Sequence, residues 1–231
     1  MYKLICFDLD DTLWPCMPTI EHAEKTLYGW LDQQYPVITR HYTTQQLRDK
    51  RKALLKTQPE LQHDLSAARR VHLQQLADEF GLSHSWVEPA FEVFYQARQQ
   101  VQLFDDVLPV LDALKQDFSL VALTNGNAHI NHTGLAEQFD FQLSAADVQA
   151  SKPHPAMFVK AMQQAGVSPS QTLHVGDHPL HDIQGARNAG IDAVWLRRFA
   201  QPWDDQFAEP AQAFNSLHAL QHWLQSSIVG K

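Results

Sequence analysis

The chain of 231 residues has few cysteines and few basic residues, and each shortage excludes a class of protein. Two cysteines, Cys6 and Cys16, cannot form a framework of disulfides, and they fit a reducing compartment. Aspartate and glutamate outnumber lysine and arginine by 26 to 18, for a formal net charge of −8. A surface that follows nucleic-acid phosphates needs a basic footprint, so we expect no nucleic-acid partner.

Long apolar runs are also missing. No stretch approaches the ~18 residues that suggest a membrane span, and the Met-Tyr-Lys start leads directly into an apolar run. We therefore expect a cytoplasmic protein without a membrane partner. With 44% hydrophobic residues, 9 glycines and 12 prolines, the chain is neither disordered nor collagen-like. Its length suits one large domain, or a core domain with a smaller insert.

Short apolar runs bounded by turn residues predict the strands Lys3–Phe7, Leu120–Leu123, Thr172–Val175 and Ala193–Leu196. They are apolar on both faces, which is typical of a parallel sheet covered by helices on both sides. Helical patterns lie between or after them, at Val107–Lys115, Pro155–Ala165, Asp182–Ala189 and Ser216–Gln225. This alternation predicts an α/β fold with right-handed crossovers.

One long segment has only helical patterns. They lie at Ile20–Gln34, Thr44–Thr57, Leu65–Phe80 and Trp86–Gln100, with stop signals at Pro36, Pro59 and Gly81 between them. Ser85 and Glu88 match a capping box at the start of the last helix. We predict a helical domain of residues 18–101, inserted after the first strand into a core of residues 1–17 and 102–231.

Three carboxylates crowd the end of the first predicted strand, at Asp8, Asp10 and Asp11, with Thr12 after them. Like charges this close are costly unless a cation neutralises them or one stays protonated. Ligands of open parallel sheets bind at the carboxyl ends of the strands. The segment therefore fits a reactive loop, although aspartates in a surface turn would look the same.

Polar residues follow two further predicted strands. Thr124 and Asn125 end one, and a hydroxyl with successive backbone N–H groups can hold an anion there. Asp177 ends another, with Asp182 five residues later, and both offer the hard oxygen ligands that Mg²⁺ takes. Lys152 lies in a proline-stiffened loop where it could neutralise a phosphate. Taken singly, each has a plain alternative. Thr124 and Asn125 could form a turn, Asp182 could cap a helix, and Lys152 could be a solvated lysine.

Taken together and in this order, the motifs resemble the haloacid dehalogenase-like hydrolase superfamily. The matching residues are Asp8-x-Asp10-x-Thr12, Thr124, Lys152 and Gly176-Asp177-x4-Asp182. The resemblance implies a Rossmann-like catalytic core, and it makes the helical insert a cap of type C1.

The resemblance also implies the site. Asp8 is the nucleophile that forms an aspartyl phosphate, and Asp10 protonates the leaving alcohol and then activates water. The residues expected to bind phosphate are Thr124, Asn125 and Lys152. The residues expected to hold the Mg²⁺ cofactor are Asp8, Asp10 through its backbone carbonyl, Asp177 and Asp182, the last directly or through water.

Several reactions remain open at this point. Dehalogenases of the superfamily lack an acid at the position of Asp10, because a halide needs no proton, so Asp10 favours a phosphatase. Phosphomutases usually carry glycine where this chain has Thr12. Receiver domains of signalling proteins combine aspartates, a threonine and a lysine without turnover, but the helical insert and the Gly176-Asp177 motif argue against them.

A narrower resemblance concerns the substrate. The stretches Phe7–Leu13, Thr124–Ala128 and His174–Asp177 are similar to the bacterial branch that dephosphorylates flavin mononucleotide and the ribitylamino-uracil phosphate precursor of riboflavin. We expect a small phosphomonoester as the partner, with His63, Arg69 and Arg70 of the cap as its polar contacts, although the two arginines could instead form a solvated face. Aromatic side chains near or in the cap, expected mostly to form its core, are Trp14, Tyr28, Trp30, Phe91, Phe94 and Tyr95.

Overall fold

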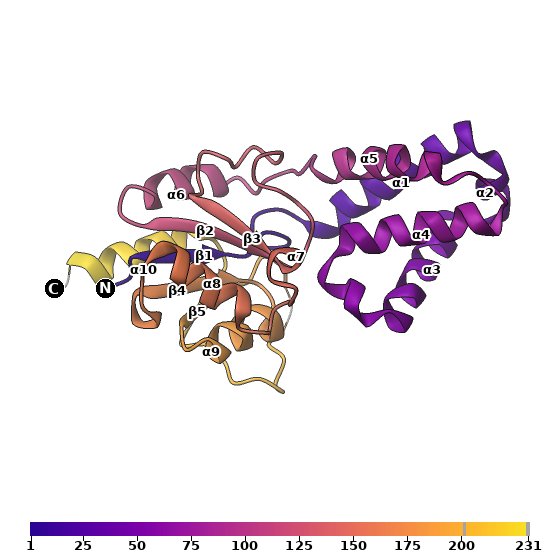
Figure 1. Cartoon of the computed structure of the whole chain (residues 1–231). Helices are drawn as coiled ribbons and strands as arrows, with labels where there is room; N and C mark the ends of the chain where they lie inside the picture. The colour runs from indigo at the N-terminus through magenta and orange to yellow at the C-terminus, as the bar shows by residue number, and fades with distance from the viewer. Residues whose placement is uncertain (201, 230–231) are drawn as a thin grey trace. The chain divides into compact units, whose positions relative to one another are not determined.

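The computed structural model describes residues 1–200 and 202–229 (Figure 1). The chain forms two compact units: Met1–Pro15 with Gln102–Lys231, called the sheet unit below, and Cys16–Val101, called the helical unit. None of the helices in the described residues is both long and apolar enough to cross a bilayer.

The sheet unit is built on one six-stranded parallel sheet of order β3-β2-β1-β4-β5-β6. The strands are β1 (Leu4–Phe7), β2 (Ser119–Thr124), β3 (Phe141–Ser144), β4 (Thr172–Gly176), β5 (Asp192–Leu196) and β6 (Gln212–Phe214). The predicted α/β fold is confirmed. Phe7 at the end of β1 pairs with Ala122 of β2 and with Val175 of β4. The loops that leave these three strands therefore start side by side at one edge of the sheet.

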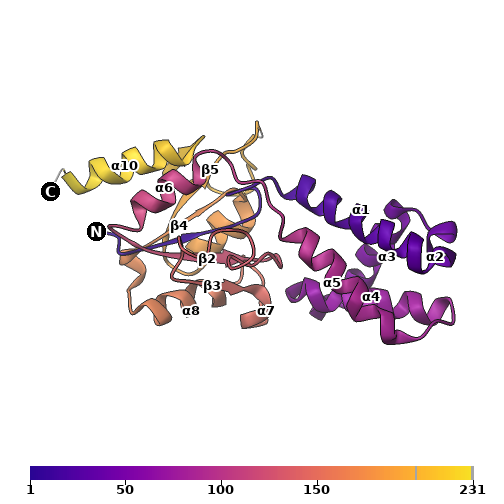
Figure 2. The same ribbon diagram turned by 90° about the horizontal axis from the view of Figure 1, so that it is seen from above.

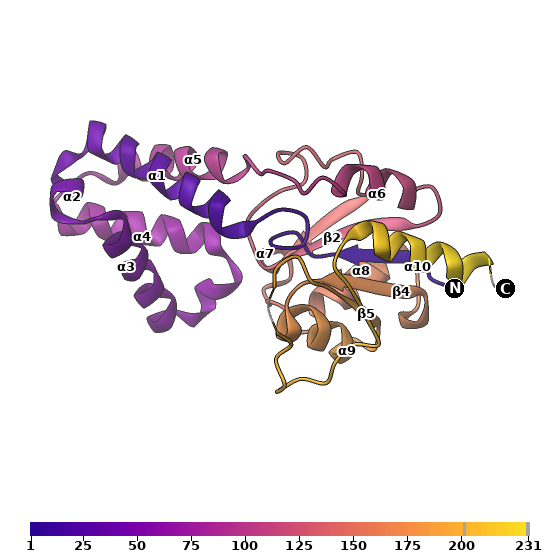
Figure 3. The same cartoon turned by 180° about the vertical axis from the view of Figure 1, so that it is seen from behind.

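Helices cover both faces of this sheet. Figure 2 shows α6 (Val107–Leu114) and α10 (Leu217–Val229) on one side, with α7 (Ala145–Val148) and α8 (Ala156–Ala165) on the other, and Figure 3 shows α6 and α10 from behind. Met157 and Phe158 of α8 pack on Cys6 and Val121 in one buried core. Gly166 ends α8 at a φ of 67°, as the predicted C-cap requires.

Some elements of the sheet unit were not predicted. They are the strands β3 and β6, helix α7 and the single turn η3 (Pro169–Gln171). β3 and β6 are the two edge strands and are only partly buried, so they lack the continuous apolar run of the inner strands. The helix predicted over Asp182–Ala189 is a π-helix, η4 (Pro179–Gln184), followed by a short α9 (Gly185–Asn188).

The helical unit contains no strand in its described residues. Its helices are α1 (Cys16–Gln34), α2 (Pro36–His41), α3 (Thr44–Thr57), α4 (Leu65–Glu79) and α5 (Val87–Arg98), with single turns η1 (Pro59–His63) and η2 (His84–Trp86). Its core is apolar, with Leu31, Leu73, Phe91 and Phe94 each at most 3% exposed. The predicted helix Thr44–Thr57 is matched residue for residue, because Thr43 and Gln46 form a capping box before it.

One local prediction in this unit is confirmed and one is wrong. α1 ends at Gln34, as the stop signal at Pro36 predicts, and Pro36 then opens the unpredicted α2, where its missing N–H costs nothing. The capping box at Ser85 and Glu88 does not form. The N-cap of α5 is Trp86, without a side-chain bond, and Glu88 instead pairs with Arg70 at 2.7 Å.

Candidate active site

The loop after β1 holds the first aspartates in a tight turn. The backbone N–H of Asp8 donates to the carbonyl of Val175 in β4 at 2.9 Å, which continues the sheet by one residue. Asp11 then takes a φ of 59°, and its N–H bonds to the carbonyl of Trp14 at 2.8 Å. The Trp14 indole Nε1 donates to Asp10 Oδ1 at 2.9 Å. The turn therefore fixes the Asp10 carboxylate in the same loop as Asp8.

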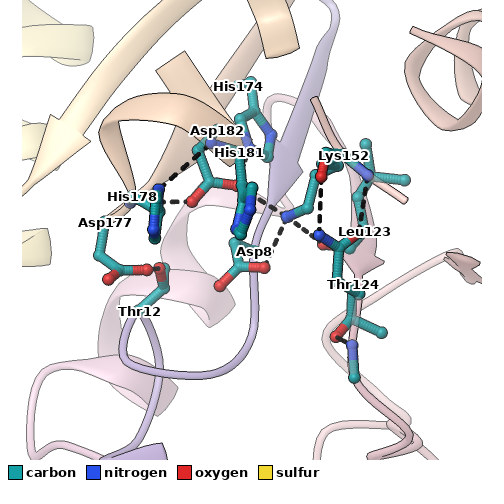
Figure 4. A network of polar contacts seen from close by, with 12 residues as sticks. Asp8, Thr12, Leu123, Thr124, Lys152, His174, Asp177, His178, His181 and Asp182 are labelled. Atoms are coloured by element: carbon teal, nitrogen blue, oxygen red, sulfur yellow. Dashed lines mark hydrogen bonds and ion pairs between the residues drawn. The ribbon is translucent and has the colours of Figure 1, made fainter. Parts of the chain in front are cut away.

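Lys152 joins three elements at the strand ends (Figure 4). Its ammonium has three N–H donors. It bonds to Asp8 Oδ1 at 2.6 Å, to Asp182 Oδ1 at 2.7 Å and to the carbonyl of Leu123 at 2.9 Å. At 2% exposed, Lys152 is buried, so the alternative of a solvated loop lysine is wrong.

Asn125 holds the Lys152 loop in place. Its Nδ2 donates to the Lys152 carbonyl at 3.0 Å, and its Oδ1 accepts the Lys152 N–H at 2.8 Å. Thr124, buried at the end of β2, accepts the Gly126 N–H on its hydroxyl oxygen at 2.9 Å. Asn125 thus positions the lysine, and the phosphate contacts expected of Thr124 and Asn125 stay predictions.

Asp182 is fixed from several directions. Besides Lys152, His174 Nε2 donates to its Oδ1 at 2.9 Å, and the backbone N–H of His178 donates to its Oδ2 at 3.0 Å. Its carboxylate lies against Gly176, where an added Cβ would come within 2.3 Å of Asp182 Cγ. Real side chains never approach so closely, so this packing requires glycine at position 176. The N-cap of η4 is His178, which excludes the alternative of Asp182 as a simple helix cap.

Asp177 is held by the loop after β1 and by the strand β5. The Thr12 hydroxyl donates to its Oδ1 at 3.3 Å, and the Trp195 indole donates to its backbone carbonyl at 2.7 Å. The carboxylate therefore faces the loop that carries Asp8.

The proton affinities of these groups reflect crowding of like charges. Burial raises the pKa of Asp8 well above its usual value; Lys152 opposes this shift, and the carboxylates of Asp182 and Asp177 add to it. Burial and the nearby carboxylates of Asp182 and Asp11 raise the pKa of Asp177 to about 7. Asp182 is also buried, but Lys152 and His174 hold its pKa well below its usual range.

The acidic cluster, defined as Asp8, Asp177, Asp182 and Lys152, fits a divalent cation. The three carboxylates can each place an oxygen within 4.8 Å of the others. With one ammonium among three carboxylates, the cluster has a formal charge of −2. Hard oxygen ligands and this charge suit Mg²⁺, and a bound cation would relieve the repulsion that raises the pKa of Asp8 and Asp177.

The motif residues line one cavity of about 170 Å³. Its lining comprises Asp8, Asp10, Asp11, Thr124, Asn125, Gly126, Lys152, Asp177, His178, His181 and Asp182. All seven residues predicted for the core site are therefore brought together within the sheet unit. The rings of His178 and His181 stack with centroids 4.0 Å apart and form part of the wall.

The three predicted cap residues lie in the helical unit. His63 ends η1, and Arg69 is buried beside Glu24 with its guanidinium 3.2 Å from the centroid of the Phe94 ring. Arg70 makes two hydrogen bonds to Glu88. Their role toward a substrate stays a prediction.

Three residues support the site although their roles were not predicted. Trp14, expected among the cap aromatics, lies fully buried in the sheet unit and holds Asp10; its spacing of four residues from Asp10 is the only sequence hint. His174 is the one ionisable residue in the strand β4, which could have marked it. Arg198 donates to the Thr12 carbonyl at 2.9 Å and to Asp106 at 2.8 Å, with no local signal at all.

A comparison with protein families decides the assignment. The model of the haloacid dehalogenase-like hydrolases matches residues 2–190. The chain belongs to this family. The resemblance drawn from the motifs is thereby confirmed, and the chain is an enzyme of the hydrolase class.

Individual relatives of this hydrolase carry names for different reactions. The 5-amino-6-(5-phospho-D-ribitylamino)uracil phosphatase YigB of Escherichia coli is 30% identical over 210 residues, which are 87% of this chain and 88% of the relative. The pyrimidine 5′-nucleotidase PynA of Streptococcus pneumoniae is 29% identical over 237 residues, which cover 100% of this chain and 98% of the relative. A crystal structure named 2-haloacid dehalogenase, from Pseudomonas syringae pv. Tomato, is 39% identical at a TM-score of 0.91. The match covers 98% of this chain and 99% of that chain.

Proposed function

We propose that this hydrolase is a Mg²⁺-dependent phosphatase that cleaves a small phosphomonoester through a phosphorylated Asp8. The observation that carries the proposal is the Asp10 carboxylate, held by Trp14 in the loop of Asp8 and beside the acidic cluster. A nucleophile, an acid and a cation site in one cavity are the groups that phosphomonoester hydrolysis needs.

The contacts of Asp8 and Lys152 indicate how the steps would run. Lys152 bonds to Asp8 Oδ1, which leaves Oδ2 for attack on phosphorus. As the bond from phosphorus to the leaving oxygen breaks, Asp10 gives its proton to that oxygen. Asp10 then takes a proton from water, the water oxygen attacks phosphorus, and inorganic phosphate leaves with Asp8 restored as a carboxylate.

Lys152 has a further part in this scheme. Its three donors already have partners, so it can bind a phosphoryl oxygen only by releasing one of them. We assign that change to the bond with Asp8, whose charge falls when it is phosphorylated. Mg²⁺, held by Asp8, Asp177 and Asp182, would supply positive charge beside the phosphoryl group.

A second candidate, hydrolytic dehalogenation, is favoured by the name of the 39% identical structure. The site argues against it. A halide leaves carbon as a stable anion, so displacement by Asp8 would need neither a proton from Asp10 nor a cation. The charge of −2 in the acidic cluster would then have no function.

Phosphate release also separates a phosphatase from a phosphomutase, because water must reach the phosphorylated Asp8 in a phosphatase but not in a phosphomutase. A phosphoaspartate that persists would instead indicate a signalling module.

For the substrate we propose a phosphomonoester with a ribityl arm, flavin mononucleotide first. The support is the 30% identity to the ribitylamino-uracil phosphate phosphatase over most of both chains. A panel of flavin mononucleotide, ribitylamino-uracil phosphate, pyrimidine nucleotides and sugar phosphates tests this choice. If the kcat/KM for both ribityl phosphates lies ~100-fold below the best substrate, a difference of about 2.7 kcal/mol, the substrate is wrong and the phosphatase stands.

The test of the metal role is a Mg²⁺ titration of aryl phosphate hydrolysis. Asp177→Asn should need at least ~10-fold more Mg²⁺ for half-maximal rate, because one charged oxygen ligand is lost. Asp117→Asn is the matched control, since Asp117 is exposed before β2. The same metal dependence in Asp177→Asn and the wild type would remove Asp177 from the cation site.

A further inference from the structure

A second buried group of charges lies inside the helical unit. Three arginines surround one carboxylate: Arg48 and Arg51 of α3 pair with Glu24 of α1 at 2.6 and 2.5 Å, and Arg69 of α4 lies 3.7 Å from it. The Glu24 and Arg69 side chains are 4% and 6% exposed, and those of Arg48 and Arg51 are below 20%. These four residues are called the arginine cluster below.

The arginine cluster has more positive charge than its carboxylate can balance. Three guanidiniums and one carboxylate give a formal charge of +2. Across the residues that the structure describes, Glu24 is the one acidic partner of these three arginines. Guanidinium groups keep their proton in proteins, so the excess cannot be removed by ionisation. Burial, together with the charge of Arg51, lowers the pKa of Arg69, as expected where a counter-charge is short.

A small cavity adjoins the cluster. It measures about 20 Å³ and is lined by residues of α1, α3 and α4, among them leucines such as Leu27 and Leu73. A cavity holds one water once it offers roughly 10–15 Å³, so this one has room for a small ligand of about that size.

His72 provides an independent sign of a missing ligand. It lines the same cavity from α4, is 3% exposed, and its Nε2 has no hydrogen-bond partner. Buried polar atoms almost always have a partner, so this nitrogen marks a place where one is expected. Burial and the charges of Arg51 and Arg69 lower the pKa of His72 to about 3, so the ring is neutral and can donate from one nitrogen.

We propose that the arginine cluster and His72 bind one chloride ion inside the helical unit. Its charge would halve the excess, His72 Nε2–H and the guanidiniums would donate to it, and its size matches the cavity. The leucine wall suits a halide better than water, because a halide needs fewer directed hydrogen bonds. This site is separate from the proposed active site and does not depend on the proposed function.

The test is thermal unfolding of the full chain in sodium chloride against sodium gluconate at one constant ionic strength. Gluconate is too large for the cavity. Replacing gluconate by chloride should raise Tm by ~3–6 °C once chloride exceeds its Kd about tenfold, and Tm should go on rising with the logarithm of the chloride concentration. Arg51→Gln should lose this response, while Arg40→Gln, which removes an exposed arginine of the same unit, should keep it.

Bromide gives the second measurement, which needs no variant. Crystals of the wild-type chain soaked in sodium bromide should show an anomalous peak between Arg51, Arg69 and His72. The proposal is overturned by a bromide map without that peak. It is equally overturned if chloride does not raise Tm above its value in gluconate, or if the rise persists unchanged in Arg51→Gln.

Discussion

The two units of this hydrolase each bury a charged cluster, and the two clusters have opposite signs. In the sheet unit, Lys152 bridges Asp8 and Asp182, two of the three carboxylates of the acidic cluster, which leaves a charge of −2. In the helical unit, Glu24 bridges the arginine cluster, which leaves +2. Each cluster has one counter-charge at its centre, and neither is balanced by its own residues.

The spaces beside the two clusters separate their uses. The acidic cluster opens into about 170 Å³ at the strand ends, where a cation and a phosphoryl group can meet reactive side chains. The arginine cluster adjoins about 20 Å³ between helices, which admits a single small ion. In both cases we infer a ligand from an uncompensated buried charge, and we infer from the volume beside it whether chemistry can follow.

Removing the proposed nucleophile should give the largest effect. Asp8→Asn should lower turnover of an aryl phosphate by ~10⁴-fold or more, because an amide neither attacks phosphorus well nor binds Mg²⁺ well. Asp117→Asn should keep wild-type turnover. Activity of purified Asp8→Asn within tenfold of the wild type would show that Asp8 is not the nucleophile.

Crowding the acidic cluster should cost both stability and rate. In Gly176→Ala the new Cβ meets Asp182, which must leave Lys152 and His174, so we expect a loss of ~2–3 kcal/mol in unfolding free energy together with lost activity. Gly29→Ala is the matched control in the helical unit. Nothing lies within 4 Å of its added Cβ, and alanine in α1 should stabilise by ~0.5–1 kcal/mol.

His72, beside the arginine cluster, should make the unfolding free energy depend on pH. Its pKa is about 3 in the folded chain, below the unfolded value of 6.5, so the unfolded state binds more protons between these pH values. The part of the unfolding free energy that depends on neutral His72 therefore falls as the pH drops below 6.5. At pH 5 it has fallen by ~2 kcal/mol. His72→Gln should show a flatter decline in unfolding free energy than the wild type from pH 7 to 5. Parallel pH profiles of the two proteins would contradict a neutral, buried His72.

An exposed ion pair should matter least. Arg70 and Glu88 have side chains 36% and 61% exposed, so Arg70→Gln should change the unfolding free energy by less than ~1 kcal/mol. The same variant tests the prediction that Arg70 contacts the substrate. A KM for flavin mononucleotide raised at least ~5-fold with stability unchanged would support that contact, and an unchanged KM would remove it.

The sequence predicted the inner sheet and the motif residues because both are local patterns. β1, β2, β4 and β5 are continuous apolar runs, and the reactive residues follow directly at or near their ends. The edge strands β3 and β6 were missed because their partly exposed residues carry no such pattern.

Contacts that depend on the path of the chain could not be predicted. Trp14 meets Asp10 only because Asp11 turns the loop through a positive φ. The arginine cluster joins α1, α3 and α4, and no spacing in the sequence places Arg69 of α4 beside Glu24 of α1. Arg69 was expected at the substrate, and nothing in the sequence indicated that it would lie buried within its own unit. Its contact with a substrate stays a prediction.

The most direct test of the account is to measure phosphate and halide release by the same preparation of the wild-type chain. The enzyme is given p-nitrophenyl phosphate or racemic 2-chloropropionate, in magnesium acetate or in EDTA. We predict phosphate release that requires Mg²⁺ and no chloride release in either buffer. Chloride release from 2-chloropropionate without any phosphate release would contradict it, because the acidic cluster and Asp10 would then have no part in the reaction.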